Sequence, residues 1–276
     1  MFSEPDSPVG ARMRAARAMA CGALGVVDLA GDVVWGYGGR TLSGAVSGGG
    51  WLRVVEGGVG GKLWEGPRTA QELVPAAVPR PVLRRIHDWD DYRAELYEYV
   101  PTGVVSRSPV LEGELALDEK WWAELGAALG MLATVPTDRV SVREEYVRRA
   151  VPEFTGCPVG EITWSTAHGD FHWANLTGPR LMILDWEGWG RAPYGFDAAL
   201  LHVYALRAPA TAARVRTVLA PILDRPEARV AELVVCAQVL QAERRTAFYT
   251  DLAGAVREYL GSTAAPGSNG ASPPPP

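Results

Sequence analysis

The spacing of apolar residues changes along the chain near residue 103. Before that point, short runs rich in valine and tryptophan alternate with glycine-rich stretches. The runs at residues 33–35, 51–55 and 94–100 have the β-branched and aromatic composition of strands. After it, apolar residues recur at steps of three and four, the period of a helix that buries one face. We therefore predict a strand-rich first part and a helix-rich second part.

The helical period is clearest in two stripes. One comprises Trp121, Trp122, Leu125, Leu129 and Leu132, and the other Val230, Leu233, Val234, Ala237 and Leu240. A further helix is expected over residues 210–223, and the alanine-rich segment 10–24 predicts one near the start of the chain. Ser141 and Glu144 have the spacing of a capping box, which predicts a helix start there. We expect these stripes to pack in a core.

Strands first and helices second define an α+β arrangement of two lobes. We place the strand-rich lobe and its connection at residues 1–103 and the helical lobe at residues 104–262. Residues 263–276 are dominated by proline, glycine and serine. Because they have too little apolar surface to offset the entropy of ordering, we predict a disordered tail there.

The most specific chemistry lies in residues 166–187. Asp170, Asn175 and Asp185 follow in that order, and an apolar–turn–apolar pattern centred on Gly178-Pro179 separates the last two. Two short strands around such a turn predict a hairpin that returns Asp185 to the segment starting at Asp170. Oxygen ligands of this kind suit Mg²⁺, which keeps waters and takes phosphate oxygens as well. A base, an amide ligand and a metal-binding carboxylate are the parts needed to transfer a γ-phosphoryl group.

Two other interpretations of this segment stay open. His168, Asp170 and His172 alternate, so on a strand they would share one face and could bind a transition metal. His172 taken alone is interpreted as a hydrogen-bonded loop residue. In the second alternative, Asp170 is a turn residue and Asn175 a cap, with structural roles only. The absence of a second ligand cluster in the sequence favours phosphoryl transfer.

With His168-Gly169-Asp170, Asn175 and Asp185, residues 166–199 resemble the catalytic loop and metal-binding aspartate of the aminoglycoside phosphotransferase family, relatives of the protein kinases. The resemblance implies a two-lobed protein-kinase-like fold with nucleotide bound between the lobes. It also implies an enzyme that moves the γ-phosphate of ATP or GTP to a hydroxyl of an aminoglycoside or another small metabolite. A non-catalytic, nucleotide-binding relative is the alternative.

The same resemblance implies roles for individual residues. Asn175 and Asp185 would hold Mg²⁺, and Asp170 would orient the acceptor hydroxyl and accept its proton. His168 would organise the loop without transferring a proton. Asp197 would brace the loop from below.

Four glycines in the first lobe are candidates for a phosphate-binding loop: Gly36, Gly38, Gly39 and Gly44. Glycine lets the backbone approach phosphates closely, and exposed N–H groups can cradle their oxygens. The spacing departs from a strict Gly-x-Gly-x-x-Gly-x-Val pattern, of which Gly44-Ala-Val46 could form the end. We place Gly39 and Gly44 at the nucleotide, and a glycine-loosened hairpin without a ligand fits equally well.

Members of the family carry a basic residue on the third strand that meets the α/β-phosphates, and a helix glutamate that holds it. The matching residues are Arg53 and Glu72, although the usual basic residue is lysine. Lys62 is the competitor, yet its ten-residue separation from Glu72 looks short for a strand, a connection and a helix turn. Arginine stays charged and can grip phosphate bidentately. Arg53 as a plain surface residue of a strand is the other interpretation.

Residues 95–103 match the connection between the lobes, where backbone groups bind the adenine edge. Glu98, Tyr99 and Val100 are the residues expected to present them. Near the motif, Trp173, Trp186 and Trp189 could form a flat wall for a sugar or a cationic ring, although core packing is expected for at least two. The role of Glu187 is open.

Composition restricts the partners. The net charge of −5 and the absence of a lysine- or arginine-rich run argue against a nucleic-acid partner. No segment approaches the roughly 20 apolar residues of a membrane span, and the arginines near the start lack the continuous apolar stretch of an export signal. Three scattered cysteines indicate a reducing compartment. We expect a cytoplasmic protein that binds nucleotide and a small-molecule hydroxyl substrate. The acceptor, the choice of ATP or GTP and the oligomeric state are not given by the sequence.

Overall fold

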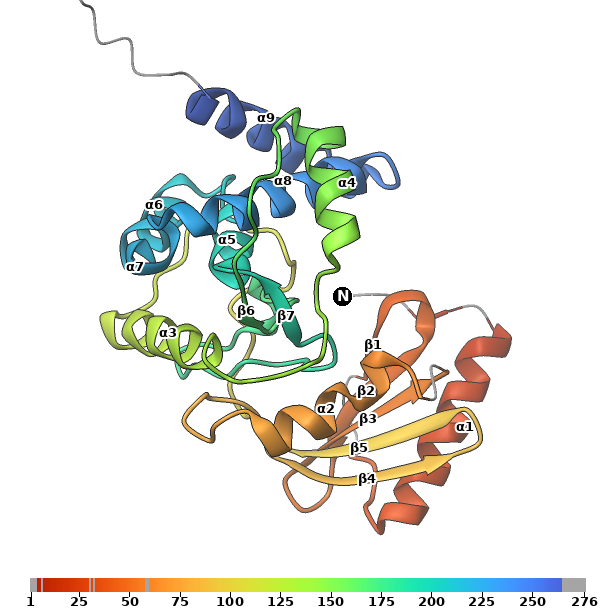
Figure 1. Ribbon diagram of the computed structural model, residues 1–276. Coiled ribbons are helices and arrows are strands. Elements are labelled where there is room, and N and C mark those ends of the chain that lie inside the picture. Colours follow the sequence, from red (N-terminus) through yellow and green to blue (C-terminus); the bar gives the residue numbers. More distant parts are fainter. Residues whose placement is uncertain (1–3, 6, 30, 32, 58–59, 265–276) are drawn as a thin grey trace, which may run out of the picture.

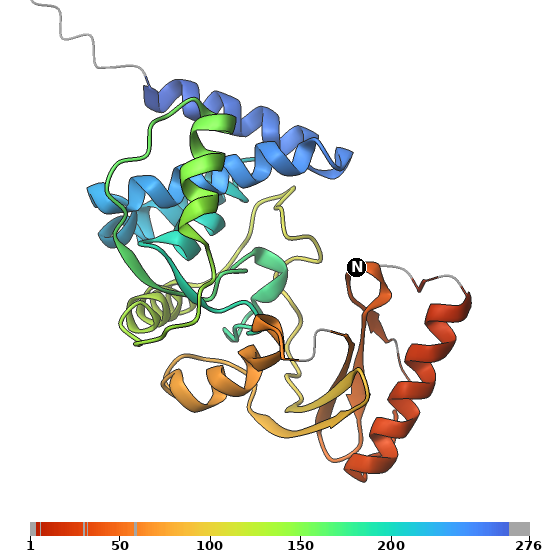
Figure 2. The ribbon, with the colours of Figure 1, turned by 45° about the vertical axis from the view of Figure 1, so that its right-hand side comes forward.

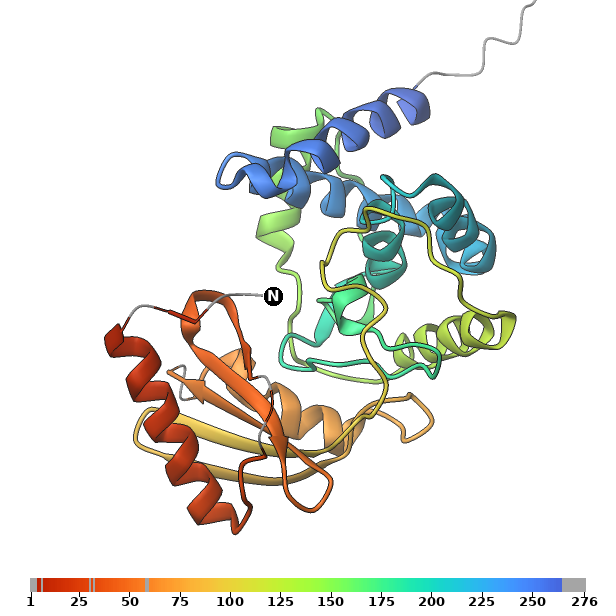
Figure 3. The same cartoon turned by 180° about the vertical axis from the view of Figure 1, so that it is seen from behind.

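The computed structural model describes residues 4–5, 7–29, 31, 33–57 and 60–264, which form two lobes joined by the segment 99–118 (Figure 1). The connection is seen from behind, in yellow, in Figure 3. Most of the predicted tail, residues 265–276, lies outside the described residues. Helix α9 (Thr250–Ala264) contains residues 263 and 264, so the expected boundary of the tail is slightly early.

A five-stranded antiparallel sheet with strand order β1-β2-β3-β5-β4 forms the base of the first lobe. Its strands are β1 (Val34–Trp35), β2 (Thr41–Val46), β3 (Gly50–Glu56), β4 (Leu83–Trp89) and β5 (Tyr92–Glu98). The three predicted strands are present as β1, β3 and β5. The pattern did not predict β2 and β4, because Gly44 interrupts β2 and β4 is an edge strand with charged residues and little apolar alternation.

The two faces of this sheet have different partners. Leu42, Leu52 and Leu96 are buried in a core shared with α1 (Ser7–Leu24), the helix predicted over residues 10–24. Helix α1 lies across this face of the sheet (Figure 2). Side chains alternate along a strand, so Arg53 and Glu95 point to the opposite face. That face is turned toward the second lobe.

The second lobe is mainly helical and contains a large core. Its helices are α3 (Glu119–Leu132), α4 (Glu144–Thr155), α5 (Phe196–Val203), α6 (Pro209–Val218), α7 (Ala220–Leu223), α8 (Arg229–Glu243) and α9. A small sheet of β6 (Trp164–Ala167) and β7 (Gly190–Pro193) flanks the motif. The predicted apolar stripes lie on α3 and α8 and are buried, except that Val230 is half-buried. No helix of the described residues has the length and apolarity to cross a membrane.

Two details of the helical predictions are wrong. Helix α4 begins where expected, but its N-cap is Arg143 and no side chain caps it. The backbone N–H of Ser141 instead donates to the carbonyl of Arg191 at 2.9 Å, which draws Ser141 toward β7 and away from the helix end. The single helix expected over residues 210–223 is two helices, α6 and α7, because Leu219 leaves the helical conformation and a proline opens α7.

Candidate active site

The predicted hairpin forms and brings the motif together. Leu176 and Ile183 are bridge partners, and the N–H of Thr177 donates to the carbonyl of Met182 at 3.1 Å. At the end of the hairpin away from the turn, the N–H of Leu184 donates to the carbonyl of Asn175 at 2.8 Å. Asp185 therefore follows directly after Leu184, the residue hydrogen-bonded to Asn175, although the two arms are joined by a single bridge and do not form full strands. The turn at Gly178-Pro179 lies at the other end of the hairpin.

The start of the catalytic loop is held by Asp197, in the first turn of α5. Its carboxylate accepts hydrogen bonds from the N–H groups of His168 at 2.7 Å and Gly169 at 3.0 Å. Burial raises the pKa of Asp197 to about 7, although these two hydrogen bonds act to lower it. The arrangement fits the bracing role that the resemblance implies.

The ring of His168 is buried and links two parts of the motif. Its Nδ1 accepts from the N–H of Asp170 at 3.3 Å, so Nε2 carries the proton and donates to the carbonyl of Leu184 at 2.9 Å. Burial lowers the pKa of His168 to about 4, and the ring is neutral at pH 7. Because both ring nitrogens are used inside the protein, His168 cannot join Asp170 and His172 in a transition-metal site, and that alternative is wrong.

Asp170 is the most accessible acid of the motif, with 54% of its side chain exposed. The side-chain NH₂ of Asn175 donates to the Asp170 carbonyl at 2.9 Å and to Oδ2 at 3.3 Å. Nε2 of His172 lies 3.5 Å from the same Oδ2. Burial acts to raise the pKa of Asp170, but His172, His168 and Asn175 outweigh it, so the pKa is below its ordinary value. Asp170 is therefore ionised at pH 7, as a proton acceptor must be.

Asp185 has a left-handed backbone, with φ of 60°. This conformation is uncommon for residues other than glycine and occurs often at functional sites. Burial, together with Asp170 and Glu95, raises the pKa of Asp185 against the opposing effect of Arg53. Its side chain is nevertheless 39% exposed. Asp185 is thus partly buried and still reached by water, and the side chain of Asp170 is more exposed still.

Asn175 and Asp185 together fit a magnesium ion. Since the NH₂ of Asn175 is directed at Asp170, its amide oxygen is left to accept a cation. Asp185 adds a carboxylate that is partly exposed and therefore open to a cation. Within the described residues, no three His, Cys, Asp or Glu side chains converge on one point. So sparse a set suits Mg²⁺, which binds one or two protein ligands plus waters and phosphate oxygens.

Arg53 is buried against three acids and is not a surface residue, with only 15% of its side chain exposed. Its Nη1 donates to Glu95 Oε2 at 3.0 Å. Its Nη2 forms an ion pair with Glu187 and lies 3.6 Å from Asp185 Oδ1. Burial acts to lower the pKa of Arg53, but the three carboxylates outweigh it and raise it. Arg53 thus stands between the sheet and the carboxylate of Asp185, where the resemblance places a phosphate-binding cation.

The expected partner of Arg53, Glu72, is not there. Glu72 is exposed near the end of α2 (Lys62–Leu73), and the ion pairs of Arg53 in the described residues go to other acids. Helix α2 approaches the motif through Gly66, where any side chain would overlap the backbone of Glu187. Lys62, the competitor of Arg53, lies at the start of α2 and donates to the carbonyl of Ser141 at 3.0 Å.

Gly44 is also misplaced by the sequence prediction. It lies inside β2, paired with Leu52, and a Cβ there would meet Nη2 of Arg17 on α1 at 3.0 Å. It therefore lies within the sheet with α1 packed against it, on the opposite side from Arg53, and not in an open loop. Gly39 does lie in the loop between β1 and β2, with φ of 70°. Its place at a nucleotide stays a prediction.

The connection between the lobes only partly matches its prediction. The N–H of Glu98 already donates to Val82 at 2.9 Å, and the N–H of Tyr99 to Gly49 at 3.0 Å. These two N–H groups are not free for a nucleotide, because the sheet continues through them. In the described part of the chain, the backbone of Val100 forms no such hydrogen bond. The buried hydroxyl of Thr102 likewise has no partner there.

The three tryptophans of the motif belong to the core. Trp173, Trp186 and Trp189 are all buried, so none forms the flat wall that was one interpretation. The indole N–H of Trp189 donates to the carbonyl of Gly66 at 2.9 Å and thereby joins the motif to α2. The residue that sequence reasoning missed is Glu95. The signal in the sequence was weak, because β5 also contains Arg93 and Glu98 and nothing marks Glu95 among these charged residues.

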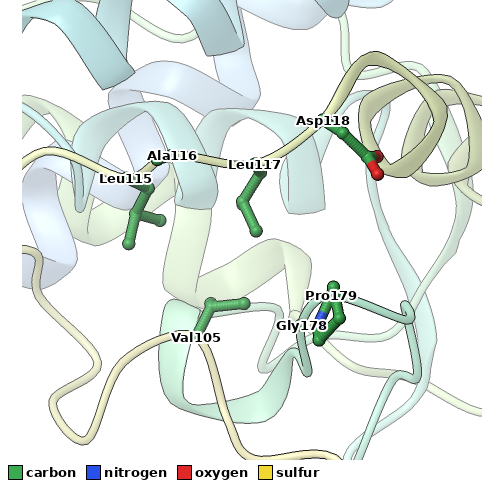
Figure 4. A pocket seen from close by; sticks show the side chains of 7 residues that line it. All are labelled: Val105, Leu115, Ala116, Leu117, Asp118, Gly178 and Pro179. Carbon is green, nitrogen blue, oxygen red and sulfur yellow. The ribbon is translucent and has the colours of Figure 1, made fainter.

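A surface hollow of about 410 Å³ lies at the turn of the hairpin and not at the motif (Figure 4). Val105, Leu117 and Pro179 line it, and its one carboxylate, Asp118, caps α3 by accepting from the N–H of Trp121 at 2.7 Å. An acid engaged in a helix cap is not available as a base. We therefore assign the candidate site to the motif around Asp170 and Asp185 and not to this hollow.

Comparison with known proteins supports the fold. No protein-family model and no curated protein matches the sequence. Among solved structures, an aminoglycoside-3'-phosphotransferase of type VIII has a TM-score of 0.57 and 15% identity, over 80% of this chain and 97% of that one. A choline/ethanolamine kinase family protein from Mesorhizobium loti has a TM-score of 0.55 and 17% identity, over 92% and 95% of the two chains.

A mutant of aminoglycoside phosphotransferase APH(4)-Ia, solved with AMP-PNP and hygromycin B, has a TM-score of 0.53 and 14% identity over 91% of this chain and 99% of that one. At such identities the similarity shows the fold. The chain thus has the α+β, two-lobed, protein-kinase-like fold of these small-molecule kinases, which confirms the fold predicted from the motif.

Proposed function

We propose that the protein is a small-molecule kinase of the aminoglycoside phosphotransferase type, which transfers the γ-phosphate of ATP or GTP to a hydroxyl group. The observation that carries this proposal is the hairpin that places Asn175 and Asp185 beside the exposed acid Asp170. A base next to a magnesium-binding pair is the arrangement that phosphoryl transfer needs. Solved structures of the same fold that contain AMP-PNP or ADP with hygromycin B support a nucleotide and a small molecule as partners.

In this proposal, Asp170 receives the proton of the acceptor hydroxyl while the acceptor oxygen bonds to the γ-phosphorus and the bond to the β-phosphate oxygen breaks, releasing ADP or GDP. Asn175 and Asp185 would hold Mg²⁺, and the ion would supply positive charge to neutralise the phosphate oxygens. Arg53 contacts the phosphates from the sheet, and Val100 and Thr102 offer polar groups to the base. Since a carboxylate is a weak base, most of the rate gain comes from positioning.

In this proposal the two lobes have different functions. Residues 1–103 bind the nucleotide, and residues 104–262 carry the loop, the metal ligands and the acceptor site. A cytoplasmic location, where nucleoside triphosphates are plentiful, belongs to the proposal. Nucleic acid and membrane are not partners in it.

The decisive experiment measures transfer of labelled phosphate from ATP and from GTP into a panel of aminoglycosides, sugars and amino alcohols, with Mg²⁺ and with EDTA. We expect magnesium-dependent transfer into at least one acceptor class. If purified protein neither binds Mg-ATP or Mg-GTP nor transfers phosphate, the proposal is wrong.

A non-catalytic nucleotide-binding protein is the second candidate, and one observation favours it. The usual lysine is replaced by Arg53, whose two terminal nitrogens are both paired with acids, namely Glu95, Glu187 and Asp185. Both candidates predict a thermal shift with Mg-ATP. Only the kinase releases ADP when an acceptor is added, and the intact set of Asp170, Asn175 and Asp185 favours the kinase.

A further inference from the structure

We propose that Glu95, on the strand next to Arg53, is the positioning residue that aims Arg53 at the nucleotide phosphates. In protein kinases a glutamate of the helix in the first lobe holds the strand cation. In this protein, Glu95 on the sheet itself would hold the strand cation in place of a helix glutamate. The inference rests on the proposed function, because it concerns how this chain binds the phosphates.

The pair is built into the sheet. Arg53 on β3 and Glu95 on β5 are direct partners in the antiparallel register, so their side chains leave the same face at neighbouring positions. Nη1 of Arg53 donates to Oε2 of Glu95 at 3.0 Å, and the hydroxyl of Tyr97 donates to the same oxygen at 3.0 Å. Glu95 is only 2% exposed. A buried carboxylate held by two donors has a fixed position, and it fixes the guanidinium in turn.

Helix α2 has no carboxylate for this role. Its two acids are Glu65 and Glu72. Glu65 forms long ion pairs with Arg68 at 3.8 Å and Arg93 at 3.9 Å. Glu72 is exposed and lies one residue before the end of α2, beyond Glu65 and Arg68. Where α2 touches the motif it presents Gly66, so the contact is made by backbone and not by charge.

This geometry also accounts for arginine at a lysine position. The fork of the guanidinium spans two directions at once, with Nη1 on Glu95 and Nη2 on Glu187 and near Asp185. A lysine ammonium is a single point charge and cannot hold both groups in this way. Because the Arg53–Glu95 pair lies within one sheet, its geometry is set by the register of β3 with β5. It does not depend on the position of α2.

The test is a double-mutant cycle on Mg-ATP binding with Arg53→Met, Glu95→Gln and the double variant, and Glu72→Gln as the matched control. Glu95→Gln keeps the size of the side chain and removes its charge. We expect it to weaken Mg-ATP binding on the order of tenfold, and to add little in the Arg53→Met background, because Glu95 acts through Arg53. Glu72→Gln is expected to bind as the wild type does. In turnover, Glu95→Gln should raise KM for the nucleotide and leave KM for the acceptor unchanged.

Binding by Glu95→Gln equal to the wild type, or an equal loss in both backgrounds, overturns the inference; the second result would assign Glu95 a structural role. A measurement without nucleotide separates failure of the inference about Glu95 from failure of the proposed function. In nitrogen-15 spectra, the Arg53 side-chain N–H signals should be protected from exchange in the wild type and in Glu72→Gln, and should lose protection in Glu95→Gln. Protection retained in Glu95→Gln contradicts the positioning role even if no nucleotide binds at all.

Discussion

The peptide groups of Leu184 join both ends of the catalytic loop: its N–H donates to the carbonyl of Asn175 at 2.8 Å, and its carbonyl accepts from Nε2 of His168 at 2.9 Å. Asp185 is the next residue along the chain. The backbone at Leu184 therefore fixes the positions of both the loop that carries Asp170 and the carboxylate of Asp185, which is expected to bind the metal. A shift of the hairpin would move both, which is how backbone hydrogen bonds can keep a base and a metal ligand in register.

The first prediction concerns Asp170. Asp170→Asn should reduce phosphate transfer by at least about a hundredfold, since an amide of the same shape cannot take up the acceptor proton. Binding of Mg-ATP should persist, because Asn175 and Asp185 are unchanged. Initial rates and calorimetry on the same preparation measure the two effects. Turnover close to the wild-type rate would remove Asp170 from the mechanism.

The second prediction concerns the metal. Asp185→Ala should weaken Mg-nucleotide binding by roughly tenfold or more, and should leave the weaker binding of nucleotide in EDTA almost unchanged. The reason is that Asp185 supplies the only carboxylate of the pair, while Asn175 supplies a neutral oxygen. Calorimetry with and without Mg²⁺ makes the comparison. Equal affinities for the variant and the wild type in Mg²⁺ would show that Asp185 is not a ligand.

Sequence reasoning succeeded where residues act through local spacing. Asn175 and Asp185 lie at the open end of one hairpin and Asp170 lies in the loop just before it, so a turn signal at Gly178-Pro179 was enough to bring them together. The stripes on α3 and α8 were found for the same reason, since a helix repeats its own period. Such relations need no knowledge of other elements.

It failed where a residue depends on a distant strand or helix. Glu72 was chosen because the family resemblance implies a helix glutamate as the partner of Arg53, but the register of β3 with β5 gives that contact to Glu95. Gly44 was chosen because Gly44-Ala-Val46 could form the end of a glycine-rich phosphate-binding pattern, but the face on which it lies depends on the pairing of β2 with β3. Register and facing are tertiary properties that single residues do not encode.

A third prediction tests the bend at Gly169, where φ is 85° and a Cβ would overlap the hydroxyl of Ser141. Gly169→Ala should destabilise the protein by several kcal/mol, adding a steric clash to the roughly 1 kcal/mol cost of a left-handed alanine. Gly156→Ala is the matched control. Gly156 has φ of 69° at the end of α4 and nothing within 4 Å of its would-be Cβ. Chemical denaturation compares the two, and equal losses would show that Ser141 does not limit this position.

A fourth prediction concerns pH. Burial lowers the pKa of His168 from 6.5 to about 4, so between these values the unfolded chain binds more protons there, and this group makes stability increase with pH. Burial raises the pKa of Asp197 from 3.8 to about 7, so over that range the native protein binds more protons, and this group makes stability decrease with pH. The two effects oppose each other in the wild type.

Asp197→Asn removes the second effect and leaves the first, because Asp170 and His172 are the charged groups that act on His168. The variant should be less stable overall, since an amide cannot accept both backbone N–H groups. Its free energy of unfolding should also rise more steeply than that of the wild type from pH 4.5 to 6.5, by up to about 3 kcal/mol. Urea titrations at several pH values measure the slopes. Parallel profiles would contradict the burial assigned to Asp197.

The last prediction follows from the place of Arg53 beside Asp185 and Glu187. In the metal-free and nucleotide-free protein, this guanidinium is the counter-charge of both acids. A divalent cation must therefore compete with Arg53 for Asp185.

Removing Arg53 alone would leave the charge of Glu95 buried and unpaired, so the variant for this test is Arg53→Met combined with Glu95→Gln. Without nucleotide, the double variant should bind Mn²⁺ several-fold more tightly than the wild type, because the competing cation is gone. With Mn-ATP the order should reverse, since the phosphates lose their contact with Arg53. Manganese binding followed by electron paramagnetic resonance, with ATP and without it, distinguishes the two effects. Adding Asp185→Ala to the double variant is the control and should abolish the gain. If the double variant binds Mn²⁺ no better than the wild type, Arg53 does not neutralise the metal-binding carboxylates.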